Sequence, residues 1–135
     1  MSKTPFPLKI VTPDGPEFEG MVEELIVRTT SGDLGILAGH VSCVAPLGMG
    51  RATVVIDGVK RYAACIGGML SVVNGQASLV PTTFEWAEDI DLPRANRSLE
   101  RAQKILHDKD ASSADIKLAE ARLRRALIRK NVASN

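Results

Sequence analysis

The sequence is poor in residues that bind metals or carry out redox chemistry. It contains two cysteines and two histidines among 135 residues, and their positions match neither metal-ligand nor redox spacing. Cys43 and Cys65 each stand among apolar residues of the kind found in strands. We therefore expect two reduced cysteines in the core, no metal site and no required cofactor.

Long apolar runs are also lacking. No stretch approaches the roughly 18 apolar residues that a membrane-spanning helix requires. At the N-terminus, Lys3 and Lys9 have no apolar run between them, and Pro5 and Pro7 interrupt the segment. This pattern excludes an ordinary signal peptide, so we expect a soluble intracellular protein.

Catalytic motifs are missing as well. The glycines between residues 32 and 39 could suggest a phosphate cradle, but no Gly-Lys-Ser/Thr follows them. Asp33, His40 and Ser42 are the residue types of a catalytic triad, yet such residues often occur near one another in strand loops by chance. We therefore expect the chain itself to be no enzyme.

Aromatic residues make up 4% of the sequence, and the net charge is +1. The charge is unevenly distributed, because residues 1–86 carry a net charge of −2 and residues 87–135 carry +3. A β-domain with a basic tail that binds nucleic acid remains an alternative function. The acidic first part and the scarcity of stacking side chains speak against a nucleic-acid partner.

Residues 1–86 show the pattern of short β-strands. Phe6, Leu8 and Ile10 alternate with other residues, which predicts a half-buried strand. Asp57-Gly58 and Asn74-Gly75 stand between strand-like runs and predict two-residue hairpin turns. Closely spaced strands with glycine turns predict an antiparallel sandwich or barrel. A segment of this length can bury enough surface to fold alone.

Between Glu85 and Ala95 the pattern changes from a period of two to a period of about 3.6. Asp91 fits the N-cap of a helix and Pro93 its first turn. Ser112, followed by an aspartate three residues later, predicts the start of a second helix. The short connection predicts an antiparallel hairpin, with helices of roughly 15 residues that are marginal in isolation.

The two predicted helices share an apolar seam with a 3-4 spacing. About half of its residues are alanines, so the seam buries little surface and the hairpin must gain stability by docking. The seam residues are Leu92, Ala95, Leu99, Ala102 and Leu106 in the first helix and Ile116, Ala119, Leu123 and Ala126 in the second.

Arginines line one face of each predicted helix. The spacing i, i+3, i+7 places three on one face, and antiparallel folding brings Arg94 near the level of Arg125 and Arg129. Clustered guanidinium groups repel one another unless an anion or carboxylate lies between them. Spacing alone favours a solvated face. The two sets are Arg94, Arg97 and Arg101, and Arg122, Arg125 and Arg129.

Two motifs resemble a known family. Residues 32–40 read Gly-Asp-Leu-Gly-Ile-Leu-Ala-Gly-His, with Leu47 and Gly50 behind them, and residues 66–70 read Ile-Gly-Gly-Met-Leu. In this order and ahead of a helical tail, they resemble the epsilon subunit of rotary F-type ATP synthases of the bacterial type. The resemblance covers essentially the whole chain and departs at Ser42, where the family commonly has proline.

The resemblance implies a fold and a place in an assembly. The fold is an antiparallel ten-stranded β-sandwich over residues 1–86, which binds the rotor, followed by a regulatory two-helix antiparallel hairpin over residues 87–135. The implied partners are the gamma subunit, the c-subunit ring and, in an inhibitory state, the alpha and beta catalytic subunits. Asp33 is expected to face the c ring and His40 the gamma subunit. The implied location is the cytoplasmic side of the cell membrane, with peripheral attachment through the complex.

The resemblance also implies regulation by ATP. Family members of the Bacillus type bind ATP on the folded hairpin through an Ile/Leu-Asp-x-x-Arg-Ala motif and further arginines. With this match we expect ATP as a regulatory ligand, although Pro93 is unusual within the motif. An inhibitory protein-contact surface without nucleotide remains the alternative. The matching residues are Glu85, Ile90, Asp91, Arg94, Ala95, Arg101, Arg125 and Arg129.

Overall fold

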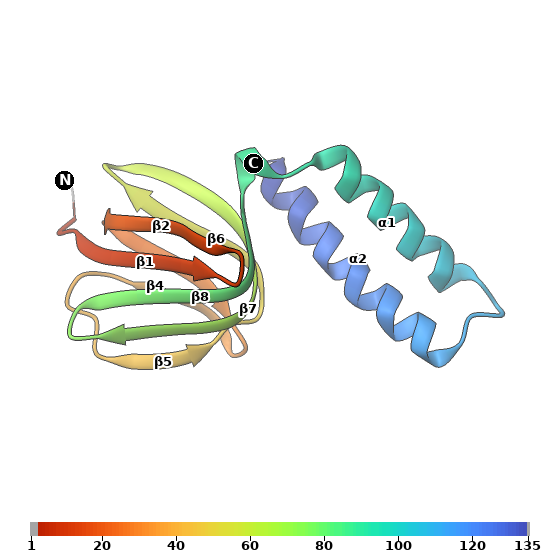
Figure 1. Ribbon diagram of the computed structural model, residues 1–135, viewed down its shortest axis with the longest axis horizontal. Helices are drawn as coiled ribbons and strands as arrows, with labels where there is room; N and C mark the ends of the chain where they lie inside the picture. Colours follow the sequence, from red (N-terminus) through yellow and green to blue (C-terminus); the bar gives the residue numbers. More distant parts are fainter. Residues whose placement is uncertain (1–2, 135) are drawn as a thin grey trace. The chain divides into compact units, whose positions relative to one another are not determined.

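The computed structural model describes residues 3–134. The chain forms two compact units, residues 1–86 and residues 87–135. The first contains β-strands, and the second contains helices (Figure 1).

Eight strands occur among the described residues of the first unit, in one sheet with the order β2-β1-β8-β7-β6-β3-β4 and β5 paired to β7. The sheet folds back on itself, so that two layers enclose a core (Figure 1). The strands are β1 (Phe6–Thr12), β2 (Gly15–Val22), β3 (Glu24–Thr29), β4 (Gly32–Ile36), β5 (Cys43–Pro46), β6 (Met49–Ile56), β7 (Val59–Val73) and β8 (Gln76–Trp86).

The sandwich followed by two helices confirms the expected fold class, but the described residues form eight strands and not ten. The longest strand, β7, runs unbroken for 15 residues. Gly67 and Gly68 have φ values of 68° and 96°, so β7 bends there without ending. A Cβ on Gly68 would lie 2.1 Å from the carbonyl oxygen of Val80, and therefore only glycine fits.

One strand pair also departs from the expected antiparallel pattern. β1 and β8 are parallel, with Leu8 opposite Ala77 and Ile10 opposite Leu79. The other paired strands are antiparallel. A parallel pair needs a long connection, and here the strands between β1 and β8 provide it. Local patterning cannot reveal such a pairing.

The two hairpin turns are confirmed. Asp57-Gly58 joins β6 to β7, and Asn74-Gly75 joins β7 to β8. All four residues have positive φ, between 50° and 79°, as a type I′ turn requires. The hydrophobic core includes Phe6, Leu8 and Ile10, all buried, as the alternation predicted.

The second unit contains η1 (Ala87–Asp89), α1 (Leu92–His107) and α2 (Ser113–Ala133). The Asp91 carboxylate accepts a hydrogen bond from the Arg94 N–H at 3.0 Å, and proline occupies the first turn of α1. The Ser112 hydroxyl accepts from the Asp115 N–H at 3.1 Å. Both predicted helix starts are therefore confirmed.

The helices pack as an antiparallel pair (Figure 1). α1 has 16 residues, close to the expected length, whereas α2 has 21. α2 is longer than predicted because neither glycine nor proline follows Ser112 to end it. Alanines dominate the buried positions, which are Ala95, Leu99, Ala102, Ala119, Ala126 and Val132.

Candidate functional site

A tight turn places Asp33 at the end of the hairpin formed by β3 and β4. The Thr29 hydroxyl donates to the carbonyl oxygen of Gly32 at 2.7 Å and accepts the Ser31 N–H at 3.1 Å. Gly32 has φ of 123°, a value that L side chains rarely adopt. The turn therefore presents Asp33, which is exposed, in a defined position.

Asp33 forms an ion pair that the sequence did not suggest. Its Oδ1 lies 3.0 Å from Nε of Arg28, and the two residues are directly opposite each other in the β3–β4 ladder. A Cβ on Gly50 would lie 2.6 Å from the Cβ of Arg28. Sequence analysis missed this partner of Asp33, and only the strand register could have revealed it.

His40 lies on the same segment beyond β4. Its Nδ1 is 2.8 Å from the carbonyl oxygen of Val41 and 4.0 Å from Sγ of Cys43. The Ser42 hydroxyl instead accepts the Asn74 N–H at 3.2 Å. These contacts join the segment to neighbouring backbone and do not bring Asp33, His40 and Ser42 together as a triad.

An apolar outer face lies beside this segment, and sequence analysis missed it too. Val44, Met69, Val73 and Val80 are 44–64% exposed. Met69 and Val80 are direct cross-strand partners, and Val44 lies opposite a residue two positions from Met69. Directly opposite residues share a face, so these side chains form one apolar patch. Patches of this kind mark protein contacts.

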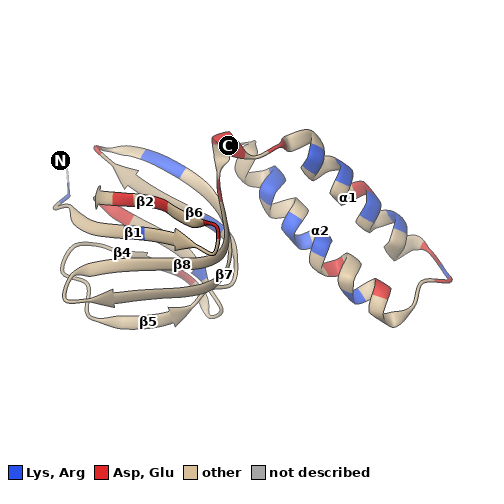
Figure 2. Cartoon of the chain, viewed as in Figure 1, with Lys and Arg blue, Asp and Glu red and all other residues tan. Residues whose placement is uncertain are grey.

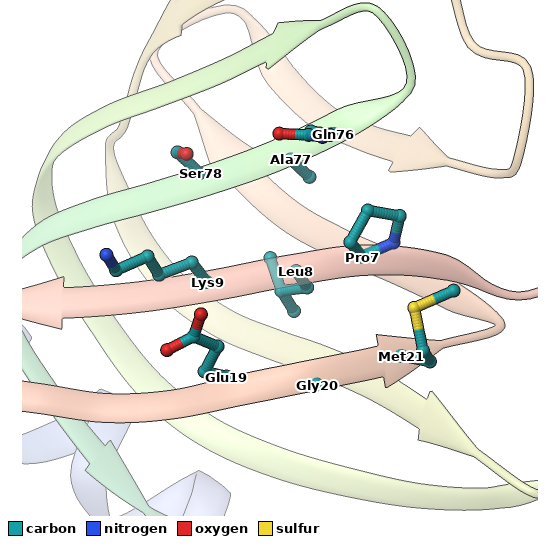
Figure 3. A pocket seen from close by; sticks show the side chains of 9 residues that line it. All are labelled: Pro7, Leu8, Lys9, Glu19, Gly20, Met21, Gln76, Ala77 and Ser78. Carbon is teal, nitrogen blue, oxygen red and sulfur yellow. The ribbon is translucent and has the colours of Figure 1, made fainter.

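A shallow hollow of about 230 Å³ lies on the outer side of β1, β2 and β8. Figure 3 shows the Lys9 ammonium and the Glu19 carboxylate on neighbouring strands at its rim. Ligand pockets usually measure roughly 300–1,000 Å³, so the hollow is small for a ligand. Its outward-facing lining residues are Pro7, Lys9, Glu19, Met21, Gln76 and Ser78.

The predicted arginine sets lie on the two helices, where basic residues occur along both (Figure 2). Arg129 is half-buried and interacts within the chain. The other five side chains are exposed, and within residues 3–134 none of them forms an ion pair. These five are Arg94, Arg97, Arg101, Arg122 and Arg125.

The structure brings only part of the predicted ATP site together. Arg94 is in the first turn of α1, Arg125 is just past the middle of α2 and Arg129 is one turn before its end, so the antiparallel packing sets all three in the half of the hairpin away from the connecting loop. Arg101 lies near the middle of α1. Glu85 is on β8 in the first unit, where its half-buried side chain interacts with another part of the chain.

Three residues of the predicted motif have structural roles. Ile90 and Ala95 are buried, at 9% and 0% exposed, so their side chains cannot present a recognition surface. Asp91 caps α1 and thereby fixes where the helix begins. The exposed Arg94 is the motif residue that is left for a ligand.

The cysteines are both free, and burial raises the pKa of the Cys65 thiol to about 12. Such a thiol is unreactive at neutral pH. Cys43 is half-buried. Within residues 3–134, no group of three or more His, Cys, Asp or Glu side chains could hold a metal ion. No helix in the same range is long and apolar enough to cross a membrane.

Two family models together match almost the whole chain. Residues 5–87 match the beta-sandwich domain of the ATP synthase delta/epsilon chain, and residues 88–134 match its long alpha-helix domain. The chain belongs to the delta/epsilon family of ATP synthase subunits. The sequence resemblance is thereby confirmed.

Relatives within the family are bacterial epsilon chains. The ATP synthase epsilon chain of Bacillus velezensis is 43% identical over 128 residues, covering 95% of this chain and 96% of that one. The epsilon chain of Bacillus cytotoxicus is 41% identical over 129 residues and covers 96% of each chain. These matches confirm the bacterial epsilon type.

Solved structures of the family share the fold. A chain of the Euglena gracilis mitochondrial ATP synthase, in an OSCP/F1/c-ring structure, aligns with a TM-score of 0.76 and 26% identity over 87% of this chain and 74% of that one. A chain of the Tetrahymena thermophila central stalk and c-ring structure aligns with a TM-score of 0.64 at 12% identity, covering 98% and 99%. The second match shows the fold alone.

Proposed function

We propose that the chain is a non-catalytic rotor subunit of the central stalk of a bacterial F-type ATP synthase. In this role it couples the gamma subunit to the c-subunit ring during ATP synthesis. The main support is 43% identity to an epsilon chain over nearly the full length of both proteins. The Euglena relative comes from a structure that contains F1 and the c-ring. The chain then lies on the cytoplasmic side of the cell membrane, attached peripherally through the complex.

The first unit supplies the rotor contacts in this proposal. The exposed Asp33 faces the c ring, and the half-buried His40, on the segment that leads into β5, faces the gamma subunit. Apolar area and a few polar groups together are what stable protein contacts use. The acidic first unit and the 4% aromatic content leave the nucleic-acid alternative without support.

The second unit is the regulatory part, and its exposed arginines carry the ATP-binding part of the proposal. Arg94, Arg125 and Arg129 lie in the half of the hairpin away from the connecting loop. A triphosphate accepts charge-assisted hydrogen bonds from guanidinium groups and removes their mutual repulsion. Asp91 caps α1 and thereby fixes the position of Arg94.

Bound ATP holds the hairpin folded and away from the catalytic subunits. The alanine-rich seam makes the folded hairpin weak, so its folded and open arrangements differ by only a few kcal/mol. A ligand at about 100 times its dissociation constant stabilises the state that it binds by ~2.7 kcal/mol. When ATP falls, the hairpin opens, contacts the alpha and beta subunits and inhibits ATP hydrolysis.

A second candidate function uses the same arginines without nucleotide. All of them except Arg129 are exposed and free of ion pairs within residues 3–134. They could therefore contact acidic segments of the catalytic subunits directly. In that case the hairpin inhibits hydrolysis, but ATP has no effect on its position.

Isothermal titration calorimetry of the full chain with ATP separates the two candidates. The Arg94→Ala, Arg125→Ala double variant tests the predicted site, and Arg124→Ala is the matched control because Arg124 is an exposed arginine outside it. We expect binding to wild type and to the control, and at least tenfold weaker binding to the double variant. Absence of heat at millimolar ATP, or equal affinities for all three proteins, would reject nucleotide binding.

A further inference from the structure

We propose that Arg28 is part of the rotor contact. It positions the Asp33 carboxylate and donates its remaining N–H groups to the same partner. This inference rests on the proposed function, which assigns Asp33 to that contact. It adds a residue, and it changes the chemistry from a single negative charge to a neutral pair that both donates and accepts hydrogen bonds.

The ion pair leaves four of the five N–H donors of Arg28 and one of the two carboxylate oxygens of Asp33 available. Nε of Arg28 meets Oδ1 of Asp33 at 3.0 Å, and the side chains are 49% and 62% exposed. An arginine side chain has five N–H donors, and a carboxylate has two oxygens. The four Nη hydrogens of Arg28 and the Oδ2 of Asp33 make no other polar contact in the part of the chain that the structure describes.

Gly50 makes room for the side chain of Arg28. A Cβ on Gly50 would lie 2.6 Å and 3.1 Å from Cβ and Cγ of Arg28, whereas a Cβ on Gly48 would be in ordinary van der Waals contact with that Cγ, at 3.5 Å. Neither Gly48 nor Gly50 has a positive φ, so their backbone does not require glycine. The lack of a side chain lets the stem of Arg28 lie across the start of β6.

Folding stability does not explain the arrangement. Exposed ion pairs contribute little to stability, and Arg28 and Asp33 are both about half exposed or more. The turn that holds Asp33 is already formed by Thr29 and Gly32. We therefore assign the Arg28–Asp33 pair to a contact with another molecule.

The pair fits a partner loop that carries an acceptor and a donor side by side. A carboxylate or carbonyl oxygen accepts from the Nη groups of Arg28, and a cationic or amide donor reaches Oδ2 of Asp33. Because the pair is neutral, the contact depends less on salt than binding through an isolated aspartate would. The orientation of the pair matters more than its net charge, because the guanidinium must face the acceptor of the partner and the carboxylate must face its donor.

The test measures rebinding of the full chain to ATP synthase complexes from which this subunit has been removed. The variants are Asp33→Asn, Arg28→Gln and the exchanged pair Arg28→Asp with Asp33→Arg. The matched control is Glu24→Gln, because Lys3 and Glu24 form another ion pair at 3.0 Å, away from the β3–β4 turn. Thermal unfolding of each variant checks that the fold is retained.

We expect Asp33→Asn and Arg28→Gln each to weaken rebinding by about tenfold, since each removes charge-assisted hydrogen bonds. The control should bind like wild type. The exchanged pair restores the ion pair but reverses donor and acceptor, so it should bind as weakly as the single variants.

Each other outcome has a definite meaning. Wild-type rebinding by Arg28→Gln, with weak rebinding by Asp33→Asn, overturns the role of Arg28 and leaves the proposed function standing. Wild-type rebinding by Asp33→Asn rejects the c-ring contact of Asp33 in the proposed function. Full rescue by the exchanged pair means that the ion pair only maintains the loop, which also overturns the inference.

Discussion

The guanidinium carbon of Arg61 lies 3.7 Å from the centroid of the Trp86 ring. Trp86 is the last residue of β8 and is 6% exposed. Its ring also meets Phe18 and Phe84 edge to face, at centroid distances of 6.2 and 4.9 Å. Aromatic packing and the guanidinium of Arg61 therefore fix the C-terminal end of β8, the last strand of the first unit.

Arg61→Ala should lower the free energy of unfolding by about 0.5–2 kcal/mol, through loss of the cation–π contact. Trp86 is the only tryptophan, so its fluorescence emission should shift to longer wavelength as water reaches the ring. Arg51→Ala is the control, because Arg51 stacks on Tyr62 at 4.6 Å. An unchanged emission spectrum in Arg61→Ala would contradict the prediction.

A chain that ends at residue 86 should fold cooperatively on its own and still join the rotor. The hydrophobic core consists of residues from Phe6 to Trp86, and removal of the helices leaves it complete. The helical unit alone, residues 87–135, should be mostly unfolded, because four of the six buried residues of its helices are alanines. Circular dichroism with urea titration measures both. A non-cooperative transition of the first fragment would show that the units depend on each other.

Asp91→Ala should destabilise α1 by about 0.5–2 kcal/mol, because it removes the side-chain acceptor for the Arg94 N–H. Asp91→Asn is the matched variant and should cost much less, since asparagine caps helices about as well as aspartate. Far-ultraviolet circular dichroism during thermal unfolding compares the three proteins. Equal losses for alanine and asparagine would mean that the charge matters and the cap does not.

Gly50→Ala should destabilise the first unit by about 1–3 kcal/mol, because its methyl group would press on the stem of Arg28. Gly35→Ala is the control, since a Cβ there meets nothing within 4 Å. Neither glycine has a positive φ, so backbone strain does not confuse the comparison. Equal stability of the two variants in urea would argue against the path that we describe for Arg28.

The pH dependence of stability should report Cys65. Burial raises the pKa of its thiol from 9.0 to about 12, so the folded state keeps a proton that the unfolded state loses. The free energy of unfolding should therefore fall between about pH 9 and pH 12, by up to ~1.4 kcal/mol per pH unit. Cys65→Ala should lack this part of the slope. Parallel pH curves for the two proteins would refute the assignment.

Local sequence determined the turns and the helix starts of this protein. Asp57-Gly58 and Asn74-Gly75 favour positive φ within the dipeptide itself. Asp91 and Ser112 accept hydrogen bonds from N–H groups three residues later. The family motifs are also continuous in sequence. These features depend on residues within a few positions of each other, so no knowledge of the sheet was required.

The strand pairings and side-chain contacts were decided by the tertiary structure. Within β7, the Gly67 N–H donates to the carbonyl oxygen of Gly48, a residue that only the fold brings near. Arg28 meets Asp33 through the β3–β4 register, and Arg61 meets Trp86 across two strands. Such contacts depend on which strands become neighbours, and a one-residue change of register would separate them. Burial of the whole apolar core selects the strand register. Local residue patterns do not determine that register.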